Sequence, residues 1–293
     1  MGILVDHKTK VICQGILSPQ GLSHIEQALA YGTNVVGGVA KDKTSDMVLG
    51  IPLFATVKEA VEATHPDATV IFSSPEEAYD EIIQAIRAEI PLIVCPTERM
   101  PVHDMLKIKV ALKKSKSRLI GPASHGILTT KECKLGTIPA HLFTEGPVGI
   151  MSRSSSVMYE AIGQLQQKGL GVSSCVVIGA YPVLGTTFED IMDLFQKDKK
   201  TKVVLMIGEI GGDFEQKLAV HYQKMKRKKP LISYVIGTYV PEKTYMGNIG
   251  AIVSDKNETA VAKKEALRQV GSVIVDSPAK IGDAVFKTLT SLG

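Results

Sequence analysis

Short apolar runs alternate with amphipathic stretches along the whole chain. A short apolar run bounded by turn residues suits a buried strand, whereas apolar residues that recur every three or four positions suit one face of a helix. Where the two patterns alternate, as they do here, the spacing indicates βαβ units and a parallel sheet. The pattern therefore predicts an α/β protein.

The first half of the chain contains expected strands with expected helices between them. The strands are Lys10–Cys13, Asn34–Val39, Thr69–Phe72, Leu92–Cys95 and Arg118–Ile120. The helices are Gln20–Tyr31, Val57–Ala63, Pro75–Glu89 and Asp104–Ser117. Sequences of the type S/T-x-x-E begin at Thr56 and at Ser74, so both residues are expected to cap a helix, with Pro75 at the first helical position.

A turn-rich segment, Gly136–Gly146, precedes a second run of the same rhythm and is the expected inter-domain link. The strands expected after it are Gly149–Met151, Cys175–Ile178, Val203–Ile207, Leu231–Ile236, Ala251–Val253 and Ser272–Val275. The helices expected after it are Val157–Gln167, Phe188–Lys197, Phe214–Lys226, Glu258–Val270 and Ile281–Leu292. We therefore expect two doubly wound domains, over 1–140 and 147–293.

Length and charge agree with this organisation. The 293 residues fit two domains of roughly 150 residues each. Basic side chains gather near 107–118 and 224–229, on or at the end of expected helices, where cations meet the negative end of the helix dipole. Neither cluster is interleaved with aromatic residues or contains a base-reading motif, so we expect no nucleic-acid partner.

The cysteines and the amino terminus suggest where the protein works. The four cysteines are widely spaced and form no C-x-x-C pair, which is typical of reduced thiols in a cytosol-like compartment. The amino terminus has no signal-peptide core, and no stretch approaches the apolar length of a membrane span. We expect a cytoplasmic protein with no metal site and no membrane partner.

The loop after the first expected strand is a candidate anion site. Gly15 and Gly21 bound a loop that opens onto a helix, and the free N–H groups of a helix N-terminus can bind a phosphate or a pyrophosphate. Lys41 and Lys43 flank Asp42 after the second strand, which favours a phosphorylated ribose, as in coenzyme A or NADP, over the ribose of NAD. An empty structural loop is the alternative.

Several segments together resemble the α subunit of succinyl-CoA synthetase (succinate–CoA ligase). They are KVICQG from Lys10, EQALAYGTNVVGGV from Glu26, TVKEAV from Thr56, KVALK from Lys109, IGP from Ile120, VGIMSRS from Val148, MIGEIGG from Met206 and MG-x-x-GAI from Met246. The resemblance extends over the whole chain with almost no gaps. It implies a Rossmann-like CoA-binding domain, a flavodoxin-like ligase domain and the acid–CoA ligase reaction of the tricarboxylic acid cycle. It also implies a β-type ATP-grasp partner that holds the nucleotide; this chain has no Walker A loop.

The resemblance also implies a set of site residues. Coenzyme A contacts are expected at Leu17, Ser18, Pro19, Gln20, Lys43, Pro96, Thr97 and Glu98. The small-molecule acid is expected near Tyr159, and the phosphoryl group at a helix N-terminus formed by Ser154, Ser155 and Ser156. Glu209 matches the carboxylate that orients the family's phosphohistidine. A carboxylate at the carboxyl end of a strand would also face the ligand crevice of such a sheet.

The sequence departs from the family at the nucleophile. The family pattern Met-Gly-His is Met246-Gly247-Asn248 here, and an amide nitrogen is neither basic nor nucleophilic. Nearby family loops also differ, at Gly121–Gly126, at Ser154–Ser156 and at Gly179–Pro182. We therefore expect a naturally diverged paralogue whose phosphohistidine chemistry is lost or altered.

Three functions are compatible with these residues. The first is an α-type subunit of an acid–CoA ligase that bypasses the phosphohistidine, and the second is a non-catalytic subunit that binds coenzyme A or an acyl-CoA beside a β-type partner. The third, an NADP-dependent oxidoreductase, rests on the glycine loop and the lysines alone. His125 is new in a loop that the family places near its active centre, and it is an alternative phosphoryl carrier.

Overall fold

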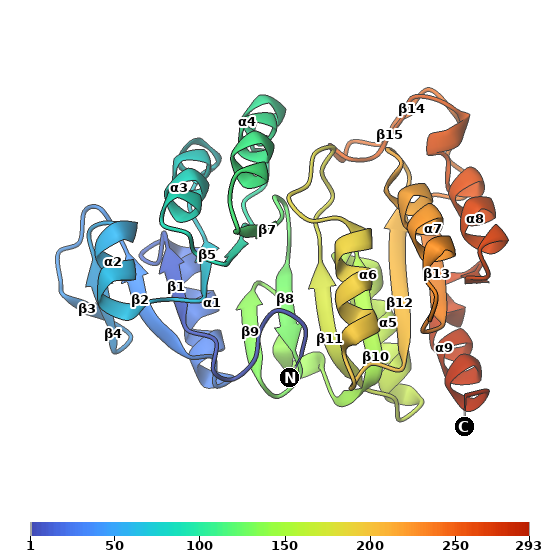
Figure 1. Cartoon of the computed structure of the whole chain (residues 1–293), viewed down its shortest axis with the longest axis horizontal. Coiled ribbons are helices and arrows are strands. Elements are labelled where there is room, and N and C mark those ends of the chain that lie inside the picture. The colour runs from blue at the N-terminus through green and yellow to red at the C-terminus, as the bar shows by residue number, and fades with distance from the viewer. Residues whose placement is uncertain (1, 293) are drawn as a thin grey trace. The chain divides into compact units, whose positions relative to one another are not determined.

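The computed structural model describes residues 2–292, which form two compact units. The amino-terminal unit comprises Leu4–Ile138 with Val183–Thr186, and the carboxyl-terminal unit comprises Pro139–Pro182, the chain from Thr187 onward and the first residues of the chain. In Figure 1 the first unit is drawn in blue to green and the second mainly in yellow to red. The α/β fold expected from the alternating pattern is confirmed in both units.

The amino-terminal unit has a sheet in the order β3-β4-β2-β1-β5-β6-β7, with every neighbouring pair parallel except β3 and β4. Its strands are β1 (Val11–Gln14), β2 (Val35–Val39), β3 (Met47–Val48), β4 (Ile51–Phe54), β5 (Ala68–Ile71), β6 (Leu92–Val94) and β7 (Arg118–Ile120). An antiparallel hairpin follows, made of β8 (Gly126–Thr129) and β9 (Cys133–Gly136). The strand order reverses between β1 and β5, and this switch point is where open α/β sheets bind ligands.

Four helices connect the strands of this sheet. They are α1 (Pro19–Ala30), α2 (Val57–Thr64), α3 (Pro75–Arg87) and α4 (Val102–Lys113). Right-handed crossovers put α1 on one face and α2 to α4 on the other, and α3 packs against both α2 and α4 (Figure 1). The expected cap at Thr56 is confirmed, because its side chain accepts a hydrogen bond from the Glu59 N–H. Ser74 is the N-cap of α3, with Pro75 next, but its side chain makes no capping hydrogen bond.

The carboxyl-terminal unit has a parallel sheet in the order β11-β10-β12-β13-β16, which is the flavodoxin order. The strands are β10 (Glu145–Ser152), β11 (Val172–Val177), β12 (Val203–Glu209), β13 (Leu231–Ile236) and β16 (Val273–Val275). The helices are α5 (Ser155–Gln167), α6 (Phe188–Lys197), α7 (Phe214–Lys224), α8 (Ala260–Gln269) and α9 (Ile281–Thr290). Short 3₁₀ turns lie at η1 (Ala140–Leu142), η2 (Lys256–Glu258) and η3 (Pro278–Lys280). Helix α5 packs beside α9, while α6 packs beside α7 and α7 beside α8.

One expected strand differs from the structure in its partner. Ala251–Val253 was expected in the parallel sheet, but β15 (Ile252–Val253) pairs antiparallel with β14 (Thr244–Tyr245) in a small hairpin. Two residues can make only a short ladder, and the side chain of Ile252 is 41% exposed, so this segment is not a buried sheet strand. The hairpin instead presents the loop that contains Asn248.

The cysteines agree with the expectation of reduced thiols. Cys13, Cys95, Cys133 and Cys175 are all buried and free of disulfides. Burial raises the pKa of the Cys95 thiol to about 12, so this side chain packs as a small neutral group.

Candidate functional site

Ser18, the N-cap of α1, fixes the conformation of the loop between β1 and α1. The Ser18 hydroxyl donates to the carbonyls of Gly15 and Phe72, at 2.8 and 3.0 Å, and accepts from the Gly21 N–H at 3.0 Å. Gly15 has a φ of +69°, which glycine adopts without strain. Pro19 has no N–H and the Gly21 N–H already donates to Ser18, so the Gln20 N–H is the donor that the first turn of α1 keeps for a ligand.

Gly21 allows α1 to approach this loop closely. A Cβ atom at Gly21 would stand 2.8 Å from the carbonyl oxygen of Ile16, and still closer to that of Gly15. We expect Gly21→Ala to lower the free energy of unfolding by about 1–3 kcal/mol, the usual effect of overpacking, in urea titrations followed by circular dichroism.

Gly163→Ala is the matched control for this prediction. Gly163 lies inside α5, and a Cβ there would meet no atom within 4 Å. Alanine should leave the stability unchanged or raise it by up to about 1 kcal/mol, because it is the better helix former. Equal effects of the two substitutions would show that close packing at Gly21 is not what holds the loop.

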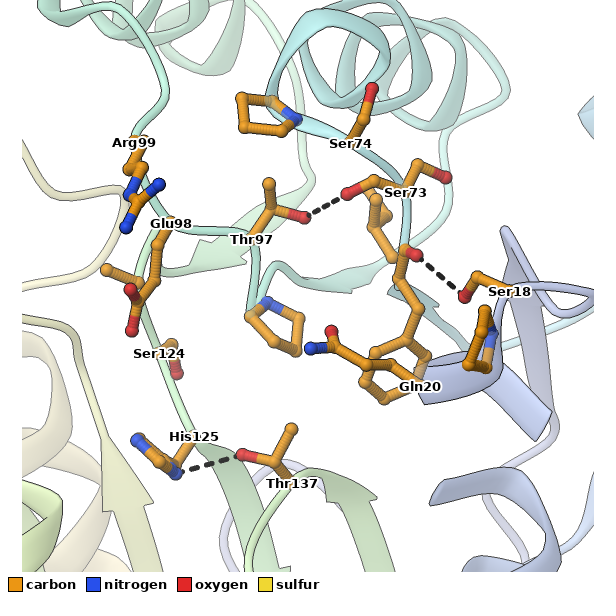
Figure 2. A pocket seen from close by; sticks show the side chains of 16 residues that line it. Ser18, Gln20, Ser73, Ser74, Thr97, Glu98, Arg99, Ser124, His125 and Thr137 are labelled. Atoms are coloured by element: carbon orange, nitrogen blue, oxygen red, sulfur yellow. Dashed lines mark hydrogen bonds between the residues drawn. The ribbon is translucent and has the colours of Figure 1, made fainter. Parts of the chain in front are cut away.

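A cavity of about 730 Å³ lies at the carboxyl ends of β1, β5, β6 and β7 (Figure 2). Six of the eight expected coenzyme A contacts line it, namely Ser18, Pro19, Gln20, Pro96, Thr97 and Glu98. The Thr97 hydroxyl donates a hydrogen bond to the Ser73 carbonyl at 2.9 Å, which joins the segment after β6 to the segment after β5. The helices α1 and α3 both begin at the wall, so two helix N-termini face the same space.

The other two expected coenzyme A contacts lie outside this cavity. Leu17 lines a second, smaller cavity, as Gly15 of the first loop also does. The Lys43 ammonium donates to Asp46 at 2.9 Å and to the Leu53 carbonyl at 3.1 Å, and Lys43 lines neither cavity.

Residues that were not expected to contact coenzyme A also line the main cavity. They include Ser73, Ser74, Arg99, Ser124, His125 and Thr137. His125 Nδ1 and the Thr137 hydroxyl lie 2.9 Å apart, and Figure 2 shows the pair together at one end of the cavity. Burial lowers the pKa of His125, although Glu98 opposes this, so the ring is a neutral hydrogen-bonding group near pH 7. Serine and threonine at strand ends carry little signal in one sequence, which is why they were missed.

In the carboxyl-terminal unit, Glu209 ends β12 next to a buried arginine. Glu209 Oε1 lies 3.1 Å from Arg153 Nη2, an ion pair whose geometry makes no hydrogen bond. Burial raises the pKa of Glu209, while Arg153 lowers it and the nearby Glu215 raises it. Glu209 is 7% exposed, so it contacts little solvent in the position where the sequence predicted an orienting carboxylate.

Asn248 lies in the loop between β14 and β15, and its side chain is exposed. Its carbonyl oxygen accepts a hydrogen bond from the Ala251 N–H at 2.9 Å, which closes the turn. Gly250, in the same turn, lies against Arg153, since a Cβ there would stand 3.2 Å from Arg153 Nη2. The fold therefore brings the loop of Asn248 beside the partner of Glu209.

The expected phosphoryl-binding serines begin α5. Ser154 is the N-cap, its side chain makes no capping hydrogen bond, and its hydroxyl lies 3.4 Å from that of Ser156. Ser155 is the first helical residue. Tyr159 follows one turn later, half-buried, with burial raising the pKa of its hydroxyl. The first turn of α5 thus keeps N–H groups that an anion could use.

Two kinds of feature were not found in the described part of the chain. Among residues 2–292, no three His, Cys, Asp or Glu side chains gather as a metal ion would require. Over the same residues, none of the helices combines the length and apolar character needed to cross a membrane.

Comparison with known proteins gives two family matches. Residues 6–99 match the family described as CoA binding domain, and residues 151–273 match the family described as CoA-ligase. The solved structure of ATP citrate lyase from Methanothrix soehngenii, in complex with citrate and coenzyme A, superposes with a TM-score of 0.89 at 24% identity. That match covers 99% of this chain and 51% of the lyase chain, so our chain spans about half its length, and the likeness concerns the fold.

Closer relatives match from end to end. The chain is 44% identical over 291 residues to the succinate–CoA ligase [ADP-forming] subunit alpha of Aquifex aeolicus, a match that covers 99% of this chain and 95% of the relative. It is 39% identical over 293 residues to the protein of the same name from Staphylococcus epidermidis, covering 100% and 97%. The chain therefore belongs to the family of succinate–CoA ligase α subunits.

Proposed function

We propose that this chain binds coenzyme A in the main cavity of its amino-terminal unit and works as the α-type subunit of an acid–CoA ligase. The observation that carries this proposal is the convergence of six expected contacts on one cavity at the switch point of the sheet. The N-terminus of α1 and the Arg99 side chain suit the negative charge of a diphosphate.

The second half of the proposal concerns the phosphoryl group. In a chain with Asn248 at the nucleophile position, an amide cannot accept a phosphoryl group as imidazole does. We propose that the chain pairs with a nucleotide-binding β-type ATP-grasp subunit, with a small-molecule acid and phosphate as the other ligands. The phosphohistidine step is lost or altered in this subunit. The coenzyme A-binding domain spans residues 1–140 and the ligase domain residues 147–293.

Asn248 also favours a second, non-catalytic function. If no other group replaces the phosphohistidine, the chain binds coenzyme A or an acyl-CoA beside its β-type partner without turnover. Acid- and CoA-dependent release of ADP or GDP by the co-purified pair separates the two functions, because only the ligase produces it.

Calorimetric titration of the purified chain with coenzyme A tests the binding proposal, with NADP as the competing ligand. We expect coenzyme A to bind and NADP to give no heat. Gln20→Glu should weaken coenzyme A binding about tenfold or more, because the new charge stands where the cavity would receive phosphate. An acidic residue in a first helical turn suits the helix dipole, so the fold is preserved.

Gln27→Glu is the matched control for charge. Gln27 is also exposed on α1, but it lies outside the cavity. Its change to glutamate should leave the affinity within about twofold, since exposed charges are screened over a Debye length. If Gln20→Glu bound coenzyme A as tightly as the native chain, the cavity would not be the site. If the native chain bound only NADP, the third function would stand instead.

A further inference from the structure

A second cavity, of about 210 Å³, lies between the first loop and α3, which lines it with Glu77, Glu81 and Gln84. Apolar side chains of Leu17, Val39 and Val57 form part of its wall. Its volume is about a quarter to a third of that of the main cavity, so it suits one compact group and not an extended chain. The shared residue Ser73 and the first loop make it continuous in the fold with the site proposed for coenzyme A.

Glu81 is the unusual residue of this second cavity. It lies on α3, and its Oε2 atom is buried without any hydrogen-bond partner. A lone buried carboxylate oxygen is costly when the group is ionised, and less so when the group is neutral. Burial raises the pKa of Glu81 to about 7, although a hydrogen bond with the Ser73 side chain opposes this.

The other charges near Glu81 come from α3 and from the loop after β2. Glu77, one turn earlier on α3, raises its pKa, and Lys41, in the loop after β2, lowers it. Asp42 lines the cavity beside Lys41. From β1 and from the end of β6 come the thiols of Cys13 and Cys95, whose pKa values are raised by burial, so both are neutral. Around Glu81 there are thus two carboxylates and one cation.

We propose that Glu81 determines the specificity of the second cavity, by holding a proton when the cavity is filled and so admitting an uncharged hydrogen-bonding group while rejecting a phosphate. A neutral carboxyl donates one hydrogen bond and accepts others, whereas a carboxylate only accepts. A ligand that fills the cavity also expels water from the carboxyl, which favours its protonated form further.

The assignment rests on the proposed function, because it takes coenzyme A as the ligand. Its phosphates suit Arg99 and the N-terminus of α1 in the main cavity. The adenine base remains as the uncharged, flat group, with ring nitrogens and an exocyclic amine. Such an edge both accepts and donates hydrogen bonds, so it matches a neutral carboxyl. Glu81 then selects this group over a charged one.

If binding takes up a proton, the affinity for the ligand must fall as the pH rises. Well below pH 7 the Glu81 carboxyl is already protonated, so binding is tightest and takes up no proton. As pH rises through 7, the free carboxyl ionises and binding must first protonate it, so affinity falls. A rise of the pKa by about one unit on binding gives roughly a fivefold weaker affinity at pH 8.5 than at pH 6.5.

The test is calorimetric titration of the full chain with dephospho-coenzyme A at pH 6.5, 7.5 and 8.5. This probe lacks a terminal phosphate that would itself titrate near pH 6. We expect affinity to fall about fivefold or more across this range. Two buffers of different ionisation enthalpy at pH 7.5 should show net proton uptake by the native chain, a result that depends on no variant.

Two variants assign the proton. Glu81→Gln keeps the shape without the charge, so its affinity should vary less than about twofold over the same pH range. Glu77→Gln removes an exposed carboxylate from the same helix and cavity, and its affinity should keep the pH dependence. A native chain without pH dependence, or a Glu81→Gln chain that keeps it, would overturn the assignment and leave the proposed function intact. No binding by the native chain at pH 6.5 would overturn both.

Discussion

Lys263→Met should destabilise the carboxyl-terminal unit by about 3–5 kcal/mol, because it leaves a buried carboxylate with only part of its compensation. The Lys263 ammonium lies 2.5 Å from Glu215 Oε2, and the side chains of both residues are completely buried. It also donates to the carbonyls of Glu209 and Gly211, at 2.9 and 2.7 Å. Methionine has nearly the same length but supplies none of these donors.

The remaining cation cannot replace Lys263. Arg153 Nη1 lies 3.3 Å from Glu215 Oε1, already donates to the Gly211 carbonyl at 3.1 Å, and its guanidinium stacks 4.7 Å from the Phe214 ring centroid. It therefore has no reach to the Oε2 side of Glu215 without giving up those contacts. The carbonyls at the end of β12 would also lose a donor, which loosens the segment that follows Glu209.

The effect should depend on pH with a definite sign. Burial alone would raise the pKa of Glu215, but Lys263 and Arg153 outweigh burial and lower it below the usual value near 4.5. A lowered folded-state pKa gives stability that is present above about pH 4.5 and is lost as pH falls through the folded value. The native chain should therefore lose stability on acidification below that range, and Lys263→Met should lose less.

Lys264→Met is the matched control for Lys263→Met. Lys264 is the next residue of α8 and is also largely buried, but its ion-pair partner Asp276, at 3.6 Å, is 79% exposed. Water can solvate Asp276 once the lysine is gone, so the loss should stay near 1 kcal/mol. Urea titrations followed by far-ultraviolet circular dichroism suit a chain without tryptophan. Equal losses in the two variants would show that the buried network is not what stabilises the unit.

The amino-acid sequence predicted the parallel sheets well, because buried strands and amphipathic helices each have a strong period. Leu231–Ile236 and Phe188–Lys197 match β13 and α6 at both ends. Strands β3 and β14 have two residues each, too few to show any period, and were missed. The hairpin of β8 and β9 was missed because its strands, GILT and CKLG, have no continuous apolar run and are too short to show a regular alternation of apolar and polar residues.

The candidate site was predictable only where a motif spans neighbouring residues. Gly15 and Gly21 before a helix were enough to expect an anion site, whereas Ser18 and Gln20 were expected as coenzyme A contacts from the family resemblance. Glu81 follows Asp80 in a helix with acidic residues in its first turn, a pattern typical of a solvated face, so its burial could not be foreseen. Lys263 and Glu215 are 48 positions apart, and only the fold of the carboxyl-terminal unit makes them partners.

Asn248→His should convert a chain that carries no phosphoryl group into one that does. We expect the native chain, incubated with a β-type subunit and γ-labelled ATP or GTP, to acquire no acid-labile phosphate. Imidazole is a nucleophile when neutral and a leaving group when phosphorylated, and the amide of Asn248 is neither. Label on the α-type chain should therefore rise from background to a readily measured fraction of chains in the histidine variant.

The surroundings of Asn248 are compatible with this gain. Its side chain is exposed at a turn closed by backbone hydrogen bonding, so an imidazole fits without repacking. Glu209 Oε1 accepts no hydrogen bond from Arg153, so it keeps the capacity to accept one from an imidazole N–H. The uncapped first turn of α5 at Ser154 offers N–H groups for the phosphoryl oxygens.

Asn248→Gln is the control, because it keeps the amide and changes only the length of the side chain. It should remain unlabelled, as should Asn248→His incubated without the β-type subunit. Label on the native chain would contradict the inference from Asn248, and His125→Ala would then show whether the histidine in the main cavity carries the group. A histidine variant that stays unlabelled, although it binds coenzyme A and its partner, would show that the altered loops at Ser154–Ser156 and Gly179–Pro182 have also lost the phosphoryl site.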